Sequence, residues 1–338
     1  MSDTPVTTSL LVLETKYRND IVSQINRMSV LARLLRVVPA ETTFPQWVAA
    51  SDSAVAESYS DGADVLNYGS DSQTQALMTW GKYRSNFHVT GTAQRVTGVS
   101  QTPASNQNQI ARRMIESSSK LASTINGALY PGSSSNEIIG LATAIGSISA
   151  TYAGIDRGSN AFWRPYVVDP GSLTAITLAT VRKDIRSIYE QSGLTPNLGI
   201  CSPGVFDALA EMFDPTRRYM MDIVNGGRGP VELNGSARAI DIEGCVFVRD
   251  KDCTANTIYY LNTDYIEIEV LPPPPAFQAM IERAQVQAED GFGVLPLGFE
   301  LQRISKTGDS DKFSLVTNLQ LKVLKPHAFG TRKNVQTT

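Results

Sequence analysis

Residues 310–325 read SDKFSLVTNLQLKVLK, and this stretch has the clearest periodicity in the chain. From residue 315 to 323 the odd positions are apolar or Thr and the even positions are mostly polar: Leu315, Thr317, Leu319, Leu321 and Val323 against Val316, Asn318, Gln320 and Lys322. A period of two is typical of a β-strand with one buried face. Leu297, Phe299 and Leu301 alternate in the same way upstream, and residues 306–311 supply a turn. The sequence therefore predicts a long β-hairpin that packs one face on a helix.

The helix that fits this face is predicted to start near Asn106, where Asn106 and Gln109 approximate a capping box, and to end at Pro131-Gly132. Apolar residues recur on one side at helical spacing: Ile110, Met114, Leu121, Ile125 and Leu129. Because Ser117–Ser119 interrupt this stripe, the middle of the helix is expected to be less buried.

The N-terminal part of the chain predicts an amphipathic helix over residues 17–38, with Ile21, Ile25, Met28 and Leu35 on one side and Pro39 as its stop. Residues 46–100 are weakly apolar and are interrupted by Ser, Asp and Gly, so the sequence predicts no compact core there. This pattern predicts an extended loop or hairpin that gains contacts in an assembly. Trp80 in particular is expected to be buried by a neighbouring subunit.

Residues 151–275 alternate between helical and strand patterns. A helix is predicted from Ser172 to Ser192, capped by Ser172 and ended by Gly193, and another follows Ser202-Pro203. Short apolar runs predict strands at residues 197–201, 245–249, 257–261 and 265–271. A glycine-rich loop spans residues 216–236. Together with the hairpin and the long helix, this predicts an α+β protein with a mixed α/β region.

The composition and motifs argue against an enzyme, a cofactor or a metal site. The chain has 30 basic and 33 acidic residues, too few cations for tight phosphate binding, so a dedicated DNA-binding role is disfavoured. Its three cysteines lack CxxC spacing, its two histidines lie far apart, and no nucleotide, protease or EF-hand motif is present. The acidic pairs Asp250/Asp252 and Asp309/Asp311 are interpreted as solvated turns. Residues 138–155 are apolar but too rich in Gly, Ser and Thr for a membrane span.

A short motif resembles one found in the major capsid proteins of tailed phages with the Hong Kong 97-like fold. It consists of Tyr152-Ala153-Gly154-Ile155-Asp156-Arg157, followed by Trp163-Arg164-Pro165. The order of the predicted elements resembles that family over nearly the whole chain. The resemblance implies five regions: an N-terminal arm with an amphipathic helix (1–45), an extended β-hairpin loop (46–100), a peripheral domain with the spine helix (101–150), an axial domain (151–275), and the long peripheral β-hairpin with the C-terminus (276–338).

The resemblance also implies a function and partners. The subunit would assemble with itself into the hexamers and pentamers of an icosahedral shell around double-stranded DNA, in the host cytoplasm, and would end in the virion. A portal protein, a separate scaffolding protein and a decoration protein would be further partners. The candidate interface residues are Trp47, Tyr68, Trp80, Lys82, Tyr83, Arg84, Arg217, Arg218, Met220, Met221 and Arg228.

Two other interpretations stay open on sequence alone. An encapsulin-like bacterial compartment would share the fold and enclose a cargo enzyme in place of a genome. A soluble α/β enzyme is the more distant alternative, and a compact, protease-resistant 46–100 region in a persistent monomer would favour it.

Overall fold

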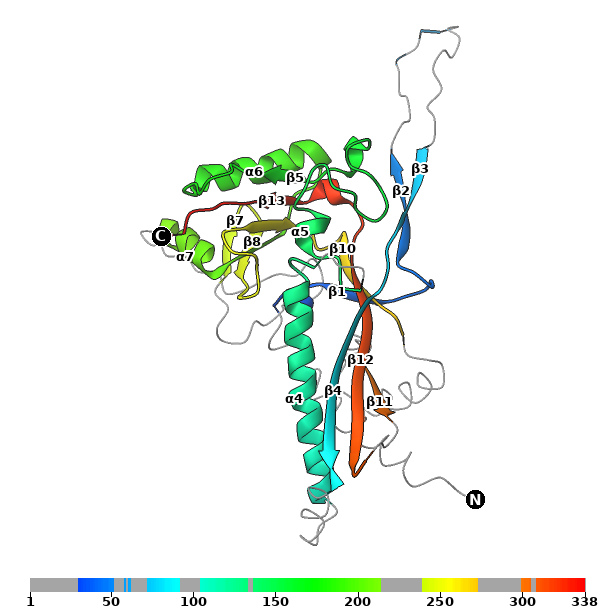
Figure 1. The fold of residues 1–338 in the computed structure, drawn as a ribbon. Helices are drawn as coiled ribbons and strands as arrows, with labels where there is room; N and C mark the ends of the chain where they lie inside the picture. The colour runs from blue at the N-terminus through cyan, green and yellow to red at the C-terminus, as the bar shows by residue number, and fades with distance from the viewer. Residues whose placement is uncertain are drawn as a thin grey trace.

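The computed structural model describes residues 30–51, 58, 60–61, 72–91, 104–132, 136–213, 239–272, 299–304 and 308–337, and the fold is given for these residues. They form an elongated layer of one long sheet and one long helix, a second sheet with its own helices at one end of that helix, and a ribbon that projects from the body (Figure 1). The long sheet contains five strands: β1 (Arg36–Pro39), β4 (Gly81–Thr90), β10 (Ile266–Val270), β11 (Glu300–Ile304) and β12 (Ser310–Val323).

Strand β12 is the centre of the long sheet. It pairs antiparallel with β11, with Leu301 opposite Leu315, which confirms the predicted hairpin in the described residues. It also pairs antiparallel with β4, from Ser310 opposite Thr90 to Leu319 opposite Gly81, and with β10 over residues 319–323. Because residues 312–316 of β12 pair with both β4 and β11, those two strands lie on opposite edges of it.

The helix α4 (Ala104–Ala128) runs beside β4 and β12 (Figure 1). Its 25 residues make a rod about 37 Å long. The expectation that its middle is less buried is wrong, because Ser117 and Ser118 are both buried. Ser117 Oγ donates to Ser85 Oγ of β4 at 2.7 Å. Small hydroxyl side chains let the helix approach the strand closely, and the hydroxyl pair satisfies their polar groups.

The N-terminal helix prediction holds only in part. Residues Val30–Leu34 are helical (α2), but Arg36–Pro39 form β1, which pairs parallel with β10. Helix through Val38 is therefore wrong: the β-branched Val37 and Val38 join a sheet edge that local periodicity does not reveal. The first part of the predicted helix, residues 17–29, lies outside the described residues.

The second sheet has six strands in the order β5 (Tyr166–Val168), β13 (Gly330–Arg332), β9 (Ile258–Leu261), β6 (Leu198–Cys201), β8 (Cys245–Arg249) and β7 (Ala239–Ile242). The helices α6 (Leu178–Ser192) and α7 (Pro203–Phe213) accompany it. The predicted start of α6 at Ser172 is wrong, because Thr177 forms a capping box with Thr180. Its end is confirmed: Gly193 has φ 69°, the left-handed conformation that glycine adopts without strain.

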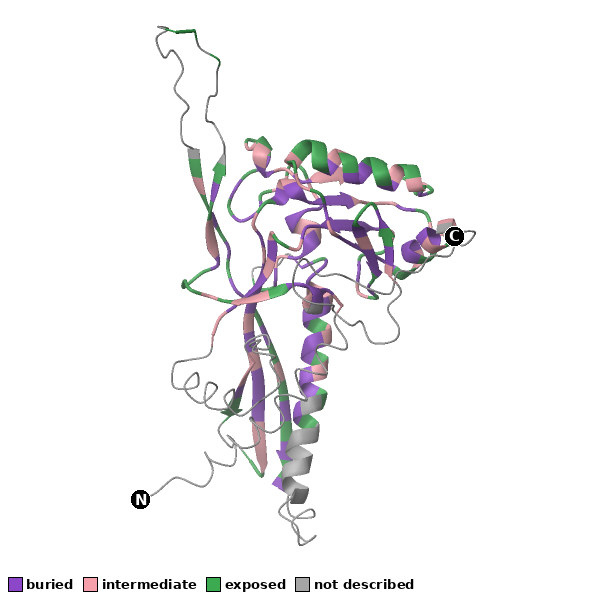
Figure 2. Ribbon diagram, turned by 180° about the vertical axis from the view of Figure 1, so that it is seen from behind, coloured by how far each residue is buried: buried purple, intermediate pink, exposed green. Residues whose placement is uncertain are grey.

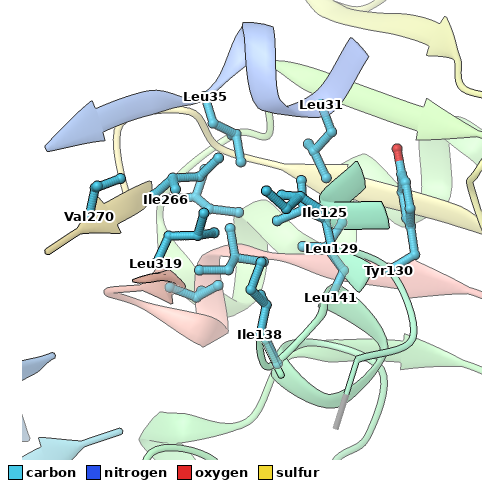
Figure 3. Close-up of a cluster of buried hydrophobic side chains, with 14 of the residues drawn as sticks. Leu31, Leu35, Ile125, Leu129, Tyr130, Ile138, Leu141, Ile266, Val270 and Leu319 are labelled. Atoms are coloured by element: carbon cyan, nitrogen blue, oxygen red, sulfur yellow. The ribbon is translucent and has the colours of Figure 1, made fainter. Parts of the chain in front are cut away.

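The structure has two apolar cores, one on each face of the second sheet, and the larger of them continues into the long sheet. The larger core lies where the end of α4 meets β10, β12 and the chain around α2, and Figure 3 shows Leu31, Leu35, Ile125, Leu129 and Leu319 converging there. The smaller core lies under α6, whose outer face is exposed (Figure 2). The apolar stretch 138–155 contributes a four-residue helix, α5 (Leu141–Ala144), to the larger core. Among the described helices, none is both long enough and apolar enough to span a membrane.

Candidate assembly surfaces

The projecting ribbon consists of β2 (Gln46–Ser51) and β3 (Ser72–Leu77), paired antiparallel from Gln46 opposite Leu77 to Ser51 opposite Ser72. Side chains alternate between its two faces. Ala49 and Ala76 are buried on the inner face, whereas Val48 and Leu77 are 63% and 49% exposed on the outer face. Neither strand contains a charged residue. The outer face is therefore an exposed, uncharged surface with apolar side chains, a type that marks interaction sites.

The root of the ribbon is held by aromatic and ionic contacts within the subunit. The Trp47 ring lies 6.3 Å from Tyr152 and 6.2 Å from Trp163 between centroids. Lys322 Nζ lies 5.4 Å from the centroid of the Trp47 ring, and it pairs with Glu267 at 3.4 Å and Glu269 at 3.3 Å. Burial raises the pKa of Glu269, while Lys322 opposes this rise. Trp47 thus anchors the ribbon on β12.

Trp80 is also a root residue. Its side chain is only 6% exposed within the subunit, and its indole Nε1 donates to the Thr43 carbonyl at 2.7 Å. The expectation that a neighbouring subunit buries Trp80 is therefore wrong. Local sequence could not show that Thr43, 37 positions earlier, lies beside it.

The candidate residues on β4 divide by strand alternation. Tyr83 is buried, and its hydroxyl accepts a hydrogen bond from the Ile138 amide at 3.0 Å. Burial raises the pKa of Tyr83. Lys82 and Arg84 are exposed on the opposite face of the strand. Tyr68, Arg217, Arg218, Met220, Met221 and Arg228 lie outside the described residues.

The segment that carries the family resemblance makes a tight turn followed by a buried cation. Tyr152 and Ile155 exchange two backbone hydrogen bonds of 3.0 Å, and the residues between them, Ala153 and Gly154, both have positive φ, at 51° and 78°. Positive φ at both central residues defines a type I′ turn. The Tyr152 hydroxyl accepts a hydrogen bond from the Val323 amide at 2.9 Å, so the turn is fixed to β12.

Arg157, just after this turn, is fully buried. Its guanidinium donates to the carbonyls of four residues: Trp163 at 3.2 Å, Thr143 at 3.2 Å, Ser147 at 2.9 Å, and Ala144. Burial lowers the pKa of Arg157 to about 10. The guanidinium carbon also lies 5.3 Å from the Tyr152 ring centroid. Arg157 therefore links the aromatic residues that hold Trp47 to the loop after α5, a role that sequence analysis missed.

The turn carboxylate Asp250 connects α4 to the second sheet. It is 1% exposed, and the Tyr130 hydroxyl donates to it at 2.6 Å. Asn126, which is also buried, donates to both Asp250 and Asp252. Interpretation of this pair as solvated is therefore wrong for Asp250. Elsewhere, Arg303 pairs with Asp311 at 2.9 Å. No cluster of three His, Cys, Asp or Glu side chains suited to a metal ion occurs in the part of the chain that the structure describes.

A second buried carboxylate, Asp184 of α6, organises the smaller core. It is fully buried, and Arg332 Nη2 of β13 donates to it at 2.6 Å. The hydroxyls of Tyr260 and Tyr166 donate to it at 3.0 and 3.1 Å. The hydrogen bond with Asp184 raises the pKa of Arg332. This network joins the C-terminal strand to three earlier elements.

Solved shell proteins share this arrangement. The capsid asymmetric unit of cyanophage A-1(L) matches with a TM-score of 0.68 at 19% identity, over 90% of this chain and 92% of that one. The capsid of a native GTA particle matches with a TM-score of 0.58 at 12% identity, over 90% of each chain. An encapsulin complex from Synechococcus elongatus matches with a TM-score of 0.53 at 12% identity, over 91% of this chain and 88% of that one.

These matches show that the chain has the Hong Kong 97-like fold. The family model described as SU10 major capsid protein matches residues 40–336. The chain belongs to that family. It is a structural protein of a tailed-phage virion that self-assembles into the icosahedral shell, and it is not an enzyme. A search of the curated protein sequences finds no match to it.

Proposed function

We propose that the ribbon β2–β3 belongs to the extended loop of this shell subunit and lies across a neighbouring copy. The main evidence is the outer face of the ribbon. Val48 and Leu77 are diagonal neighbours on this face, and Phe44, just before the ribbon, is 49% exposed. Isolated two-stranded ribbons are marginally stable in water, and natural proteins usually protect exposed strand edges with charges. This ribbon has none, which fits a surface that becomes covered on assembly.

The other regions take the roles that the resemblance implies. The long sheet with α4 forms the peripheral domain, and it draws strands from residues 36–39, 81–90 and 266–270 in addition to the C-terminal hairpin. The six-stranded sheet with α6 and α7 forms the axial domain, and residues 216–236 would lie at the centre of hexamers and pentamers. Residues 1–45 act as the arm, and residues 36–39 within it (β1) pair with the edge of the peripheral sheet. A portal, a separate scaffolding protein and a decoration protein are the remaining partners, and packaged DNA is contacted weakly.

Electron microscopy of the purified protein tests this proposal. Closed shells are expected for the natural sequence. Val48→Asp should prevent shells, because a carboxylate would be buried against the neighbour. Its free energy of unfolding as a free subunit should change by only about 0.5 kcal/mol, since the site is exposed there.

Ile148→Asp is the matched control, because Ile148 is 55% exposed on the body of the subunit. Shells from Val48→Asp at the natural yield would contradict the role of the ribbon. Persistent monomers of the natural sequence would contradict assembly itself. Particles that enclose a protein cargo and no DNA would favour an encapsulin-like compartment, a fold relative of this chain.

A further inference from the structure

The backbone alternation of the ribbon shows which groups of β2 point away from β3. In an antiparallel pair, successive residues turn their backbone N–H and C=O groups alternately toward the partner strand and away from it. The Met78 amide donates to the Pro45 carbonyl at 2.9 Å, directly beside the paired residues of β2 and β3. The odd positions of β2 therefore bond to β3, and the even positions point away from it. The outward positions are Gln46, Val48 and Ala50.

The outward edge of β2 is open. Gln46, Val48 and Ala50 present three N–H and three C=O groups there, and none of these groups has a hydrogen-bond partner within the part of the chain that the structure describes. Val48 and Ala50 are also exposed. The edge of β3 differs, because the Leu77 amide donates to the Ala153 carbonyl at 3.0 Å. We call the outward groups of β2 the open edge.

The open edge lacks the features that usually prevent a strand edge from pairing with another chain. Such edges commonly carry a Lys, a Pro or a β-bulge. Residues 46–51 read QWVAAS and contain neither Lys nor Pro. The register with β3 runs without a bulge from Gln46 opposite Leu77 to Ser51 opposite Ser72. The open edge can therefore accept a further strand, and a two-stranded ribbon gains stability from added strands.

The strand that matches the open edge best is β2 of a second copy, placed antiparallel. With Val48 opposite Val48 of the partner subunit, Gln46 lies opposite Ala50 of the partner subunit. Each outward N–H then meets an outward C=O, three from each strand and six hydrogen bonds in all. Neither strand carries a charge that would repel its copy. A strand with cations, such as β4 with Lys82 and Arg84, would find no anion on β2.

We infer that β2 of one subunit pairs with β2 of a second subunit across a two-fold axis of the shell. The two ribbons, of two strands each, then form one sheet of four strands. The inference rests on the proposed role of the ribbon and deepens it, because the outer face covers one neighbour and the open edge joins another. The contact is isologous, since the same patch lies on both sides, and isologous contacts lie on two-fold axes. An icosahedral shell contains such axes.

Val48→Pro tests the open edge while the side chain stays apolar. Because the Val48 amide points away from β3, proline leaves the ladder within the ribbon intact, as it does on natural edge strands. Proline removes both hydrogen bonds of the central pair, so the subunit concentration needed for shells should rise at least about tenfold. Gln75→Pro is the matched control. Gln75 lies opposite Val48 and its amide points out at the other edge, so this concentration should stay within about threefold of the natural value.

Cysteine cross-linking tests the register. Opposed residues of a hydrogen-bonded pair have Cα atoms about 5.5 Å apart, a distance that a disulfide spans. Shells of Val48→Cys should therefore give covalent dimers on oxidation, detected on a non-reducing gel. Ala50→Cys alone should give none, because Ala50 lies opposite Gln46 of the partner subunit, whereas Gln46→Cys together with Ala50→Cys should give dimers. The three natural cysteines are buried, so the natural sequence should give no such band.

The results separate the edge from the outer face. Shells from Val48→Pro at the natural concentration, or shells of Val48→Cys without a dimer band, would overturn the pairing, even where Val48→Asp prevents shells. A dimer band from Ala50→Cys alone would show a different register and would equally overturn it. Circular dichroism of the free subunits shows whether each variant is folded, and the cysteine variants keep the test valid if the proline variant is not. Failure of the natural sequence to form shells would refute the proposed function instead.

Discussion

Replacement of Arg157 tests the junction that supports the ribbon. Arg157→Met removes the guanidinium donors to four carbonyls: the hydrogen bonds to Trp163 and Ala144 are buried, and those to Thr143 and Ser147 are partly buried. Each buried acceptor left without a donor costs about 1 kcal/mol or more, and the release of a buried charge offsets part of this cost. The free energy of unfolding should therefore fall by about 3 kcal/mol.

Urea unfolding of the free subunit, below the concentration at which shells form, measures this loss. Arg157→Lys is the matched control: its ammonium has three donors but lacks the planar fork, so it should lose about half as much. The loss should be the same at pH 6 and pH 8. The pKa of Arg157 is lowered only to about 10, so the group is charged in both the folded and the unfolded state across that range. A loss below about 1 kcal/mol for Arg157→Met would refute the reasoning.

Three further changes have distinct expected results. Asp250→Ala leaves the buried Tyr130 hydroxyl without its acceptor and should lower the free energy of unfolding, measured by urea titration, by about 2–3 kcal/mol. Asp264→Ala, in a turn, is the control and should leave the free energy of unfolding almost unchanged. Gly81→Ala places a Cβ 2.7 Å from the backbone nitrogen of Ile138 and should lower the melting temperature by several degrees, with Gly308→Ala as a control in open space. Burial lowers the pKa of His327, and its buried Nδ1 has no hydrogen-bond partner, so its contribution to stability is present above pH 6.5 and lost as pH falls below that value. His327→Gln should flatten the slope of the unfolding free energy against pH, measured by urea unfolding at a series of pH values. An unchanged slope would contradict this prediction.

Sequence predicts those parts of the fold whose signal is local. The alternation at residues 315–323 needs no knowledge of a partner, so it correctly predicts the strand and the face that is buried. The helix end at Gly193 follows from one residue in the same way. Strand β1 is missed because its partner, β10, lies more than 200 positions away, and the apolar residues before Pro39 fit a helix equally well.

For the candidate site too, sequence predicts the features with a local signal and misses those that depend on distant residues. Composition predicts an extended segment within residues 46–100, but it does not predict which residues fix the base of that segment to the subunit. The sequence near Trp80 offers no partner for its indole and so predicts an interface residue, whereas in the structure the indole donates to the Thr43 carbonyl. In the sequence, Arg157 is distinguished only by its place in the segment that carries the family resemblance. Nothing in its spacing shows that it binds carbonyls from positions 143 to 163.

The contrast between the root and the outer face of the ribbon explains how one strand pair can serve both the subunit and the shell. On the inner face, Trp47 meets two aromatic rings and Lys322, so the direction of the ribbon is set before any neighbour arrives. On the outer face, Val48 and Leu77 have no such partners among the described residues. A fixed root reduces the conformational entropy that association must overcome, because the docking surface is already oriented. An uncharged, exposed face supplies the apolar area that association buries. The alternation of a β-strand places both requirements in six residues.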